Sequence, residues 1–152
     1  MTPIARVTTA DLGELIALMR GYCDFYEVAP SDEALRALAQ TLIDDPERSG
    51  LQLLGRDDAG SAVGFATIYW TFSTLSAGPI GVMNDLYVDP AARGTGVGEA
   101  LIRACESECE ARDVAVLEWE TAPENHRAQS LYDRLGAERT SWLAYSLAVT
   151  RR

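Results

Sequence analysis

The stretch Asn84-Asp-Leu-Tyr-Val-Asp-Pro-Ala-Ala-Arg-Gly-Thr-Gly-Val-Gly98 decides how this chain is interpreted. A strand-like segment over residues 82–88 ends at Asp89-Pro90, and a helical pattern begins at Glu99. Glycine lacks a Cβ, so a loop with a glycine at every second position can turn tightly and approach a ligand closely. The unpaired N–H groups and the positive dipole end of the following helix then predict a site for a phosphate or pyrophosphate.

Two common phosphate-binding motifs do not fit this loop. The glycines are spaced G-x-G-x-G rather than G-x-G-x-x-G, and no Gly-Lys-Ser/Thr follows. A turn without a ligand rarely needs three alternating glycines behind an arginine. The pattern Arg-x-x-Gly-x-Gly behind Leu-Tyr-Val-Asp-Pro resembles the acetyl-CoA-binding motif of the GNAT superfamily of N-acetyltransferases. The resemblance implies that acetyl-CoA is the cosubstrate and that its binding residues here are Leu86, Tyr87, Val88, Arg93, Gly94, Thr95, Gly96, Val97, Gly98 and Glu99.

A second motif lies near the C-terminus. Asn125 and Tyr132 are seven residues apart, which places them two turns apart on one face of a predicted helix over 125–135. The pattern Asn-x-x-Ala-x-x-x-Tyr-x-x-x-Gly resembles the second GNAT signature. The resemblance implies that Asn125 contacts the CoA arm and that Tyr132 protonates the departing thiolate as general acid. From the residues themselves, Asn125 also fits a helix N-cap, and Tyr132 a core aromatic.

The chemistry of acetyl transfer needs a base, because a primary amine with a pKa of about 10 is protonated at neutral pH. Asp85, on the motif strand, and Glu120, near the end of the strand expected over 114–121, are the candidate bases. Glu118 shares the face of Glu120 and ranks below it. His126 is an alternative, although its place beside Asn125 favours the rim of the cofactor site. The family resemblance implies a backbone N–H donor for the acetyl oxygen within residues 86–88.

The sequence specifies the amine that accepts the acetyl group less closely than it specifies the cosubstrate. The segments from Asn84 and from Glu124 to Tyr132 resemble the histone and polyamine (diamine) N-acetyltransferase groups, and so does Trp70-Thr-Phe-Ser-Thr. Those diamine enzymes often carry Glu-Asp where this chain has Asn84-Asp85, so one substrate-facing carboxylate is missing. The leading hypothesis is a small cationic amine, polyamine or amino-acid-like; a protein lysine acceptor and a non-catalytic acyl-CoA-binding module remain alternatives. Aromatic faces can hold a cation, and the expected substrate-binding residues are Tyr22, Phe25, Tyr26, Trp70, Phe72, Asn84, Asp85 and Trp142.

The periodicity along the chain predicts the order β-α-α-β-β-β-α-β-α-β. That is an α/β protein of the GNAT fold, with a mixed, mostly antiparallel sheet and flanking helices, in one domain over residues 1–152. The last one or two strands are expected over 137–149. The resemblance further implies a homodimer formed through the segment 142–147.

Composition and charge indicate where the protein is located and which partners it favours. The formal net charge of −10 disfavours nucleic acid and anionic membranes and favours a cationic partner. No apolar run is long enough to span a bilayer, and the N-terminus lacks the layout of a signal peptide, so a cytoplasmic location is expected. Cysteines at 23, 105 and 109, with one histidine, favour reduced thiols and no metal site.

Overall fold

The computed structural model of the protein describes residues 2–150 and divides into two compact units, which meet between Glu120 and Thr121. The first unit contains a five-stranded sheet and three long helices, and the second contains one helix and a long C-terminal segment. The strands are β1 (Ile4–Arg6), β2 (Gly50–Arg56), β3 (Ala62–Ser73), β4 (Gly78–Val88) and β5 (Leu117–Glu118); the helices are α1 (Leu12–Phe25), α2 (Asp32–Asp44), α3 (Val97–Ala111) and α4 (His126–Arg134), with short 3-10 turns η1 (Thr9–Asp11) and η2 (Pro90–Ala92).

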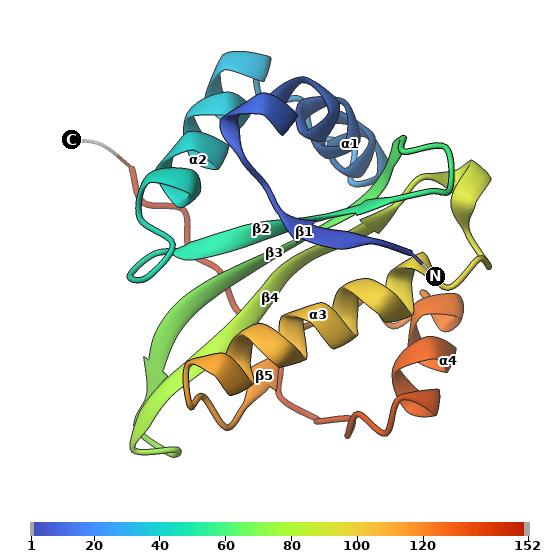
Figure 1. Ribbon diagram of the computed structural model, residues 1–152. Helices are drawn as coiled ribbons and strands as arrows, with labels where there is room; N and C mark the ends of the chain where they lie inside the picture. Colours follow the sequence, from blue (N-terminus) through green and yellow to red (C-terminus); the bar gives the residue numbers. More distant parts are fainter. Residues whose placement is uncertain (1, 151–152) are drawn as a thin grey trace. The chain divides into compact units, whose positions relative to one another are not determined.

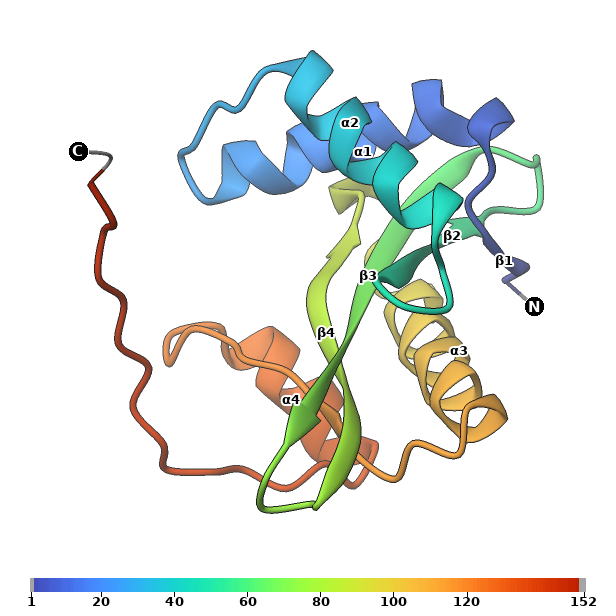
Figure 2. The same cartoon turned by 90° about the vertical axis from the view of Figure 1, so that its left-hand side faces the viewer.

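The sheet has the strand order β1-β2-β3-β4-β5. The first four strands are antiparallel neighbours, and β5 joins β4 in parallel through only two residue pairs, Gly81 with Leu117 and Val82 with Glu118. Helices α1 and α2 cover one face of this sheet and α3 covers the other (Figures 1 and 2). The β4-α3-β5 connection is a crossover between two parallel strands.

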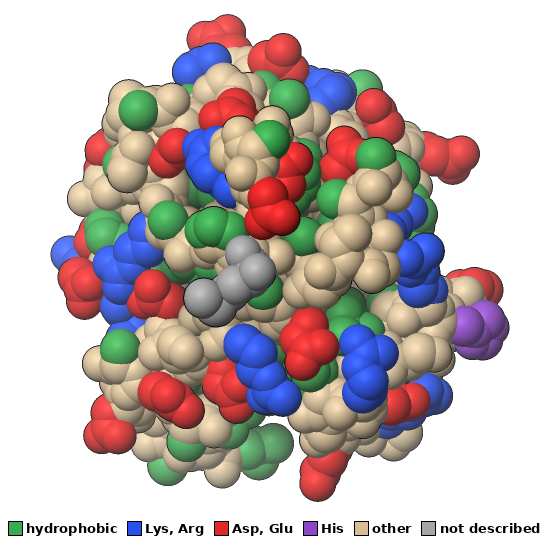
Figure 3. Space-filling model, turned by 45° about the vertical axis from the view of Figure 1, so that its right-hand side comes forward, with side chains coloured by type: hydrophobic (Ala, Val, Ile, Leu, Met, Phe, Trp, Pro, Cys, Tyr) green, Lys and Arg blue, Asp and Glu red, His purple; other side chains and the backbone are tan. Residues whose placement is uncertain are grey.

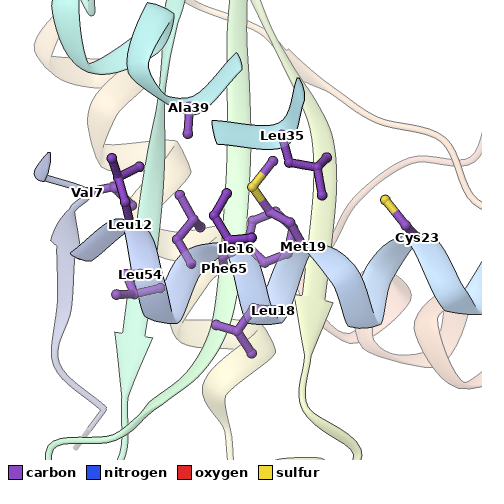
Figure 4. Packing of buried hydrophobic residues seen from close by; sticks show 11 residues of the cluster. Val7, Leu12, Ile16, Leu18, Met19, Cys23, Leu35, Ala39, Leu54 and Phe65 are labelled. Carbon is purple, nitrogen blue, oxygen red and sulfur yellow. The ribbon is translucent and has the colours of Figure 1, made fainter. Parts of the chain in front are cut away.

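The core under α1 and α2 follows from helical periodicity. Leu12, Leu15, Ile16 and Met19 are buried on one side of α1 and pack with residues of α2 and of the sheet (Figure 4). The Asp11 carboxylate accepts the Thr8 N–H at 2.8 Å, which closes the turn before α1.

Helix α3 starts two residues earlier than the sequence pattern predicts. Gly96 is its N-cap, with a φ of 93° in the left-handed region, and Val97 is its first residue. Val97 is 3% exposed and lies against Gly55 and Gly64 of the sheet. The missing side chains of these two glycines allow this close contact, which fixes the first turn of the helix.

Strand β4 contains a bulge. Thr67 of β3 is paired with Asp85, but the next residue, Ile68, is paired with Met83, so Asn84 is one extra residue on β4. If residues 83–85 alternated regularly, Asp85 would share the face of Met83, toward α3. Because Asn84 is an extra, unpaired residue, Asp85 instead faces α1, on the same side as its cross-strand partner Thr67.

Two expected strands differ in the structure. The strand expected over 114–121 is shortened to Leu117–Glu118. Within that stretch only these two residues are paired with β4, as Leu117 with Gly81 and Glu118 with Val82. The segment 137–150, expected to hold the last strands of the order β-α-α-β-β-β-α-β-α-β, has no strand. Its apolar side chains alternate as in a strand, but a strand needs a hydrogen-bonded neighbour, and Trp142 and Tyr145 are 84% and 91% exposed.

In the second unit, helix α4 has the predicted ends. The Asn125 side chain accepts the Ala128 N–H at 3.2 Å as its N-cap. Gly136, with a φ of 84°, follows its C-terminus. Among the described residues, no helix combines the length and hydrophobicity needed to cross a bilayer.

Candidate functional site

The loop between β4 and α3 is an exposed turn ordered by its own hydrogen bonds. Arg93 donates from Nε to the Val88 carbonyl oxygen at 3.1 Å, and the Thr95 hydroxyl donates to the Ala92 oxygen at 2.5 Å. Gly94 and Gly96 have φ values of 80° and 93°, which residues with a Cβ rarely adopt. A Cβ at Gly96 would meet nothing within 4 Å, so the space over the loop is open to a ligand.

The start of α3 directs hydrogen-bond donors into this space. The Ala100 N–H donates to the Gly96 oxygen at 3.0 Å, and N–H groups earlier in the first turn have no acceptor inside the helix. The helix dipole adds partial positive charge at the same end. A glycine loop followed by a helix start suits a phosphate or pyrophosphate, and binding of such a group here stays a prediction from the sequence.

One edge of β4 is open beside this loop. Pairing with β5 stops at Val82, so within the described residues the rest of that edge has no strand neighbour. The Asp89 N–H donates to Val63 of β3, and N–H directions alternate along a strand. The N–H groups of Leu86 and Val88 therefore point away from β3, toward the open edge, whereas that of Tyr87 points toward β3.

Asp85 is a buried carboxylate on this strand. It is 8% exposed and accepts a hydrogen bond from Asn84 Nδ2 at 2.9 Å. Burial, the Asp85 charge and hydrogen bonding to Asp85 raise the pKa of the Tyr22 hydroxyl of α1 well above its ordinary value. Burial and the same charge also raise the pKa of Tyr69. The buried carboxylate is therefore surrounded by groups that hold their protons.

The other carboxylates proposed as bases lie in a different environment. Glu118 and Glu120 are exposed, on β5 and just after it. Both lie in the first unit, where the chain leaves its short pairing with β4. The structure thus places one candidate base in the interior and two at the surface.

Three of the aromatic residues expected to bind the acceptor form one cluster. Tyr22 and Tyr26, at the end of α1, have ring centroids 5.0 Å apart, and Phe25 lies 5.1 Å from Tyr26. Tyr22 also packs edge-on against Tyr87 of β4. Tyr26 and Phe25 are 50% and 59% exposed, so the cluster joins the buried carboxylate to the surface.

Trp70 is not part of that cluster. It is paired with Gly81, whose side faces Cys109 of α3, so Trp70 lies on the opposite face of the sheet from Tyr22. Its indole N–H donates to the Pro46 oxygen at 2.9 Å, and the Arg112 guanidinium covers its ring at 4.3 Å. Phe72, near the β3–β4 turn, is 82% exposed and has no packed environment.

The second signature, with Asn125 and Tyr132, lies in the second unit. Asn125 caps α4, so one of the two roles considered for it is present. Tyr132 is half-buried on the same helix, and His126 is exposed at its first residue.

Sequence reasoning missed Thr67, which is paired with Asp85, and Gln52, which is hydrogen-bonded to Thr67. Both are polar but only 0% and 3% exposed, on strands that are otherwise apolar there. A polar residue inside an apolar strand window is the signal that could have found them. No group of three or more His, Cys, Asp or Glu side chains suited to a metal ion occurs within residues 2–150.

Comparison with known proteins agrees with this fold. The chain belongs to the acetyltransferase (GNAT) family, whose profile matches residues 15–137. It is 30% identical to an uncharacterized N-acetyltransferase, YhfO, of Bacillus subtilis, over 96% of this chain and 97% of that protein. It is 28% identical to the thialysine N-epsilon-acetyltransferase of Mus musculus, over 95% and 91% of the two chains. The fold matches AAC(6')-Iy in complex with the bisubstrate analog CoA-S-monomethyl-acetylneamine, with a TM-score of 0.83, 20% identity and 99% of both chains covered.

Proposed function

We propose that the protein transfers the acetyl group of acetyl-CoA to a primary amine of a small cationic acceptor. The observation that carries this proposal is the buried carboxylate of Asp85, which lies on the strand whose open edge leads into the phosphate-binding loop. The thialysine enzyme of Mus musculus is named for an amino-acid-like amine, which supports an acceptor of that kind. The family profile spans both structural units, which supports one functional domain over residues 1–152.

The cosubstrate fits the residues of the first unit. The amides of residues 94–98 and the start of α3 would hold the pyrophosphate of acetyl-CoA. Arg93 orders this loop through its bond to the Val88 oxygen. The Leu86 and Val88 N–H groups, which point to the open edge of β4, would bind the extended part of the cofactor and the acetyl oxygen. Asn125 would contact the CoA arm from the second unit.

The proposed reaction is direct attack on the thioester. Asp85 accepts a proton from the ammonium form of the acceptor, directly or through a water, and the free amine attacks the acetyl carbonyl carbon. The carbonyl oxygen becomes an oxyanion that a β4 amide stabilises. When the C–S bond breaks, Tyr132 donates its proton to the CoA thiolate, and the second proton lost by the attacking nitrogen as the amide forms returns Tyr132 to its protonated state. Glu120 is the second candidate base.

A cationic acceptor is favoured by the surroundings of Asp85. The exposed rings of Tyr26 and Phe25 at the end of α1 offer faces to a cation, and the carboxylate lies behind them. The chain has a net charge of −10, although acidic and basic side chains are interspersed on the face in Figure 3. Asn84 in place of a carboxylate supports an acceptor with fewer positive groups than a polyamine, such as an amino acid.

The test is release of CoA thiol from acetyl-CoA across a panel of amines. The panel holds spermine, spermidine, putrescine, L-lysine, thialysine, D-amino acids and a basic histone-tail peptide. All 13 basic residues of the chain are arginines, so self-acetylation of lysine cannot add to the signal. Turnover on a small amine supports the proposal, and turnover on the peptide alone replaces it with a protein acceptor.

A Tyr132→Phe variant tests the general acid in the same assay. Lost turnover with retained acetyl-CoA affinity supports catalysis by Tyr132. Unchanged turnover removes Tyr132 from the mechanism. Tight acetyl-CoA binding by the unaltered protein, without turnover on any amine, would favour an acyl-CoA-binding module.

We also propose a homodimer formed through the C-terminal segment. Leu143, Tyr145 and Leu147 are 79–91% exposed and alternate as in a strand, and a second copy would give them a partner. Sedimentation of the full chain and of a chain ending at Glu138 measures this. A shorter chain that sediments with the same subunit number overturns the proposed interface.

A further inference from the structure

A row of three buried polar side chains crosses the middle of the sheet. Gln52 of β2 is paired with Thr67 of β3, which is paired with Asp85 of β4. Directly paired residues point to the same face, so all three side chains lie under α1. Their exposed fractions are 3%, 0% and 8%.

The neighbouring row on the same face is apolar and aromatic. It consists of Leu54, Phe65 and Tyr87, which are also paired in this order and belong to or pack on the core in Figure 4. A polar row beside it is costly to bury unless its groups are bonded to one another. The stability of the polar row therefore depends on the hydrogen bonds among its members.

Gln52 sets the direction of the bonds in this row. Its Nε2 donates to the Thr67 hydroxyl oxygen at 3.1 Å and lies 3.9 Å from the Met19 sulfur of α1. Its Oε1 is buried and has no partner among the described residues. A buried acceptor without a donor lowers stability, because nothing compensates the water it has lost. The amide is thus held with its donor toward Thr67 at a cost to stability.

The Thr67 hydroxyl then has a proton to donate. Its oxygen accepts from Gln52, so its own hydrogen points elsewhere. The cross-strand partner on its other side is the Asp85 carboxylate, and side chains of directly paired residues are close enough to interact. Asn84 and Tyr22 approach the same carboxylate from β4 and α1.

We propose that Thr67 is a positioning residue, whose hydroxyl, oriented by Gln52, donates to Asp85 and fixes the carboxylate that accepts the amine proton. The inference rests on the proposed function, in which Asp85 is the base. Donors from three elements then hold the carboxylate: Thr67 from β3, Asn84 from β4 and Tyr22 from α1. A carboxylate held in one orientation keeps a lone pair available to the acceptor, and small errors in such positioning slow the chemical step.

The test compares Thr67→Val, which keeps the shape and removes the hydroxyl, with Thr67→Ser, which keeps the hydroxyl. We expect Thr67→Val to lower kcat about tenfold with the KM for acetyl-CoA unchanged, the size typical of lost supporting hydrogen bonds. We expect Thr67→Ser to retain kcat within about twofold. Thr71→Val, an exposed position on the same strand, is the matched control.

A second variant keeps the inference testable if Thr67→Val does not fold. Gln52→Met removes the amide that orients Thr67 and also removes the unpartnered oxygen. We expect a kcat loss of about threefold without a loss of stability against urea, since the cost of the buried acceptor is removed. A Gln52→Met protein with full kcat overturns the orienting role of Gln52.

A spectroscopic measurement separates this inference from the proposed function. The carboxyl-carbon NMR resonance of Asp85, recorded at one pH, reports its hydrogen bonds whether or not the protein turns over. We expect it to move in Thr67→Val and to stay in Thr67→Ser and Thr71→Val. An unmoved resonance in Thr67→Val overturns the inference. A moved resonance with full turnover in both Thr67→Val and Asp85→Asn overturns the positioning role because Asp85 is then not the base.

Discussion

Gly96 is the residue at which the loop turns into α3, with a φ of 93° and no atom near the position of a Cβ. Substitution therefore meets backbone strain rather than a collision. We expect Gly96→Ala to lower the free energy of unfolding by about 1–2 kcal/mol and to weaken acetyl-CoA binding. Urea unfolding and titration calorimetry measure the two effects.

Gly13 of α1 is the matched control for that substitution. It is exposed, has a helical backbone and also has nothing within 4 Å of a Cβ. Gly13→Ala should leave acetyl-CoA binding unchanged and raise stability by up to about 1 kcal/mol. Equal stability effects in the two variants would contradict the strain assigned to position 96.

The role of Asp85 as the base is tested by the variant Asp85→Asn, which carries an amide in place of the carboxylate. Asp85→Asn keeps the shape and removes the charge, so we expect kcat to fall about 100-fold or more while acetyl-CoA affinity is retained. Stopped assays at several pH values measure the loss. Glu120→Gln is the comparison, because that carboxylate is exposed and lies just beyond β5. A larger loss in Glu120→Gln would transfer the role of base to Glu120.

At the scale of elements, the contact of α3 with the sheet depends on Gly64 of β3. A Cβ there would lie 2.9 Å from the backbone carbonyl oxygen of Tyr87, 3.0 Å from Val97 Cγ1 and 3.2 Å from Leu101 Cδ1. We expect Gly64→Ala to lower the free energy of unfolding by about 1–3 kcal/mol, because backbone and helix must both move.

Gly78, at the start of β4, is the control for Gly64. A Cβ there would have a single neighbour, the Ser76 oxygen at 3.9 Å. Gly78→Ala should change stability by less than about 1 kcal/mol. Thermal unfolding of both variants distinguishes a specific contact at 64 from a general intolerance of alanine in the sheet.

The elements that local patterns specify were predictable. Leu12, Ile16 and Met19 give the period of α1, and Asn125 and Gly136 mark the ends of α4. The extra residue Asn84 was not predictable, because a bulge is set by pairing with another strand and leaves no periodic signal.

The same reasoning explains the mixed result at the candidate site. The turn from strand to helix at the glycine motif could be predicted from sequence, because its residues are contiguous. The side of the sheet on which Trp70 lies, and the burial of Gln52 and Thr67, depend on partners far along the chain. The C-terminal segment around Trp142 has strand alternation but no strand neighbour among the described residues, so alternation over-predicted structure there.

At the scale of the whole molecule, groups whose pKa differs between the folded and unfolded states make the free energy of unfolding depend on pH. Bonds from Thr8 and Arg56 lower the pKa of Asp11, so its contribution to stability is present above the ordinary carboxyl pKa and is lost as the pH falls below about 4. Burial raises the pKa of the Cys109 thiol from 9.0 to about 11, so its contribution is lost as the pH rises from 9 to 11.

Urea unfolding from pH 3 to pH 10.5 measures both limbs of that profile. We expect the acid limb to flatten in Asp11→Asn and the alkaline limb to flatten in Cys109→Ala, each relative to its own value at pH 7. An alkaline limb that is unchanged in Cys109→Ala would assign it to another group, such as Cys105, whose burial also raises its pKa.

The extra residue in β4 has a consequence for changes of chain length. A strand has a period of two, and the extra residue Asn84 shifts the alternation once, between Met83 and Asp85. Deleting Asn84 would leave Thr67 paired with Asp85 directly beside Ile68 paired with Met83, so residues 85–88 would keep their layers. Deleting Leu86 and closing the bulge would instead pair Asn84 with Thr67, and the carboxylate at 85 would enter the layer of α3. A one-residue deletion in this strand would therefore preserve or invert the site according to the residue that is lost.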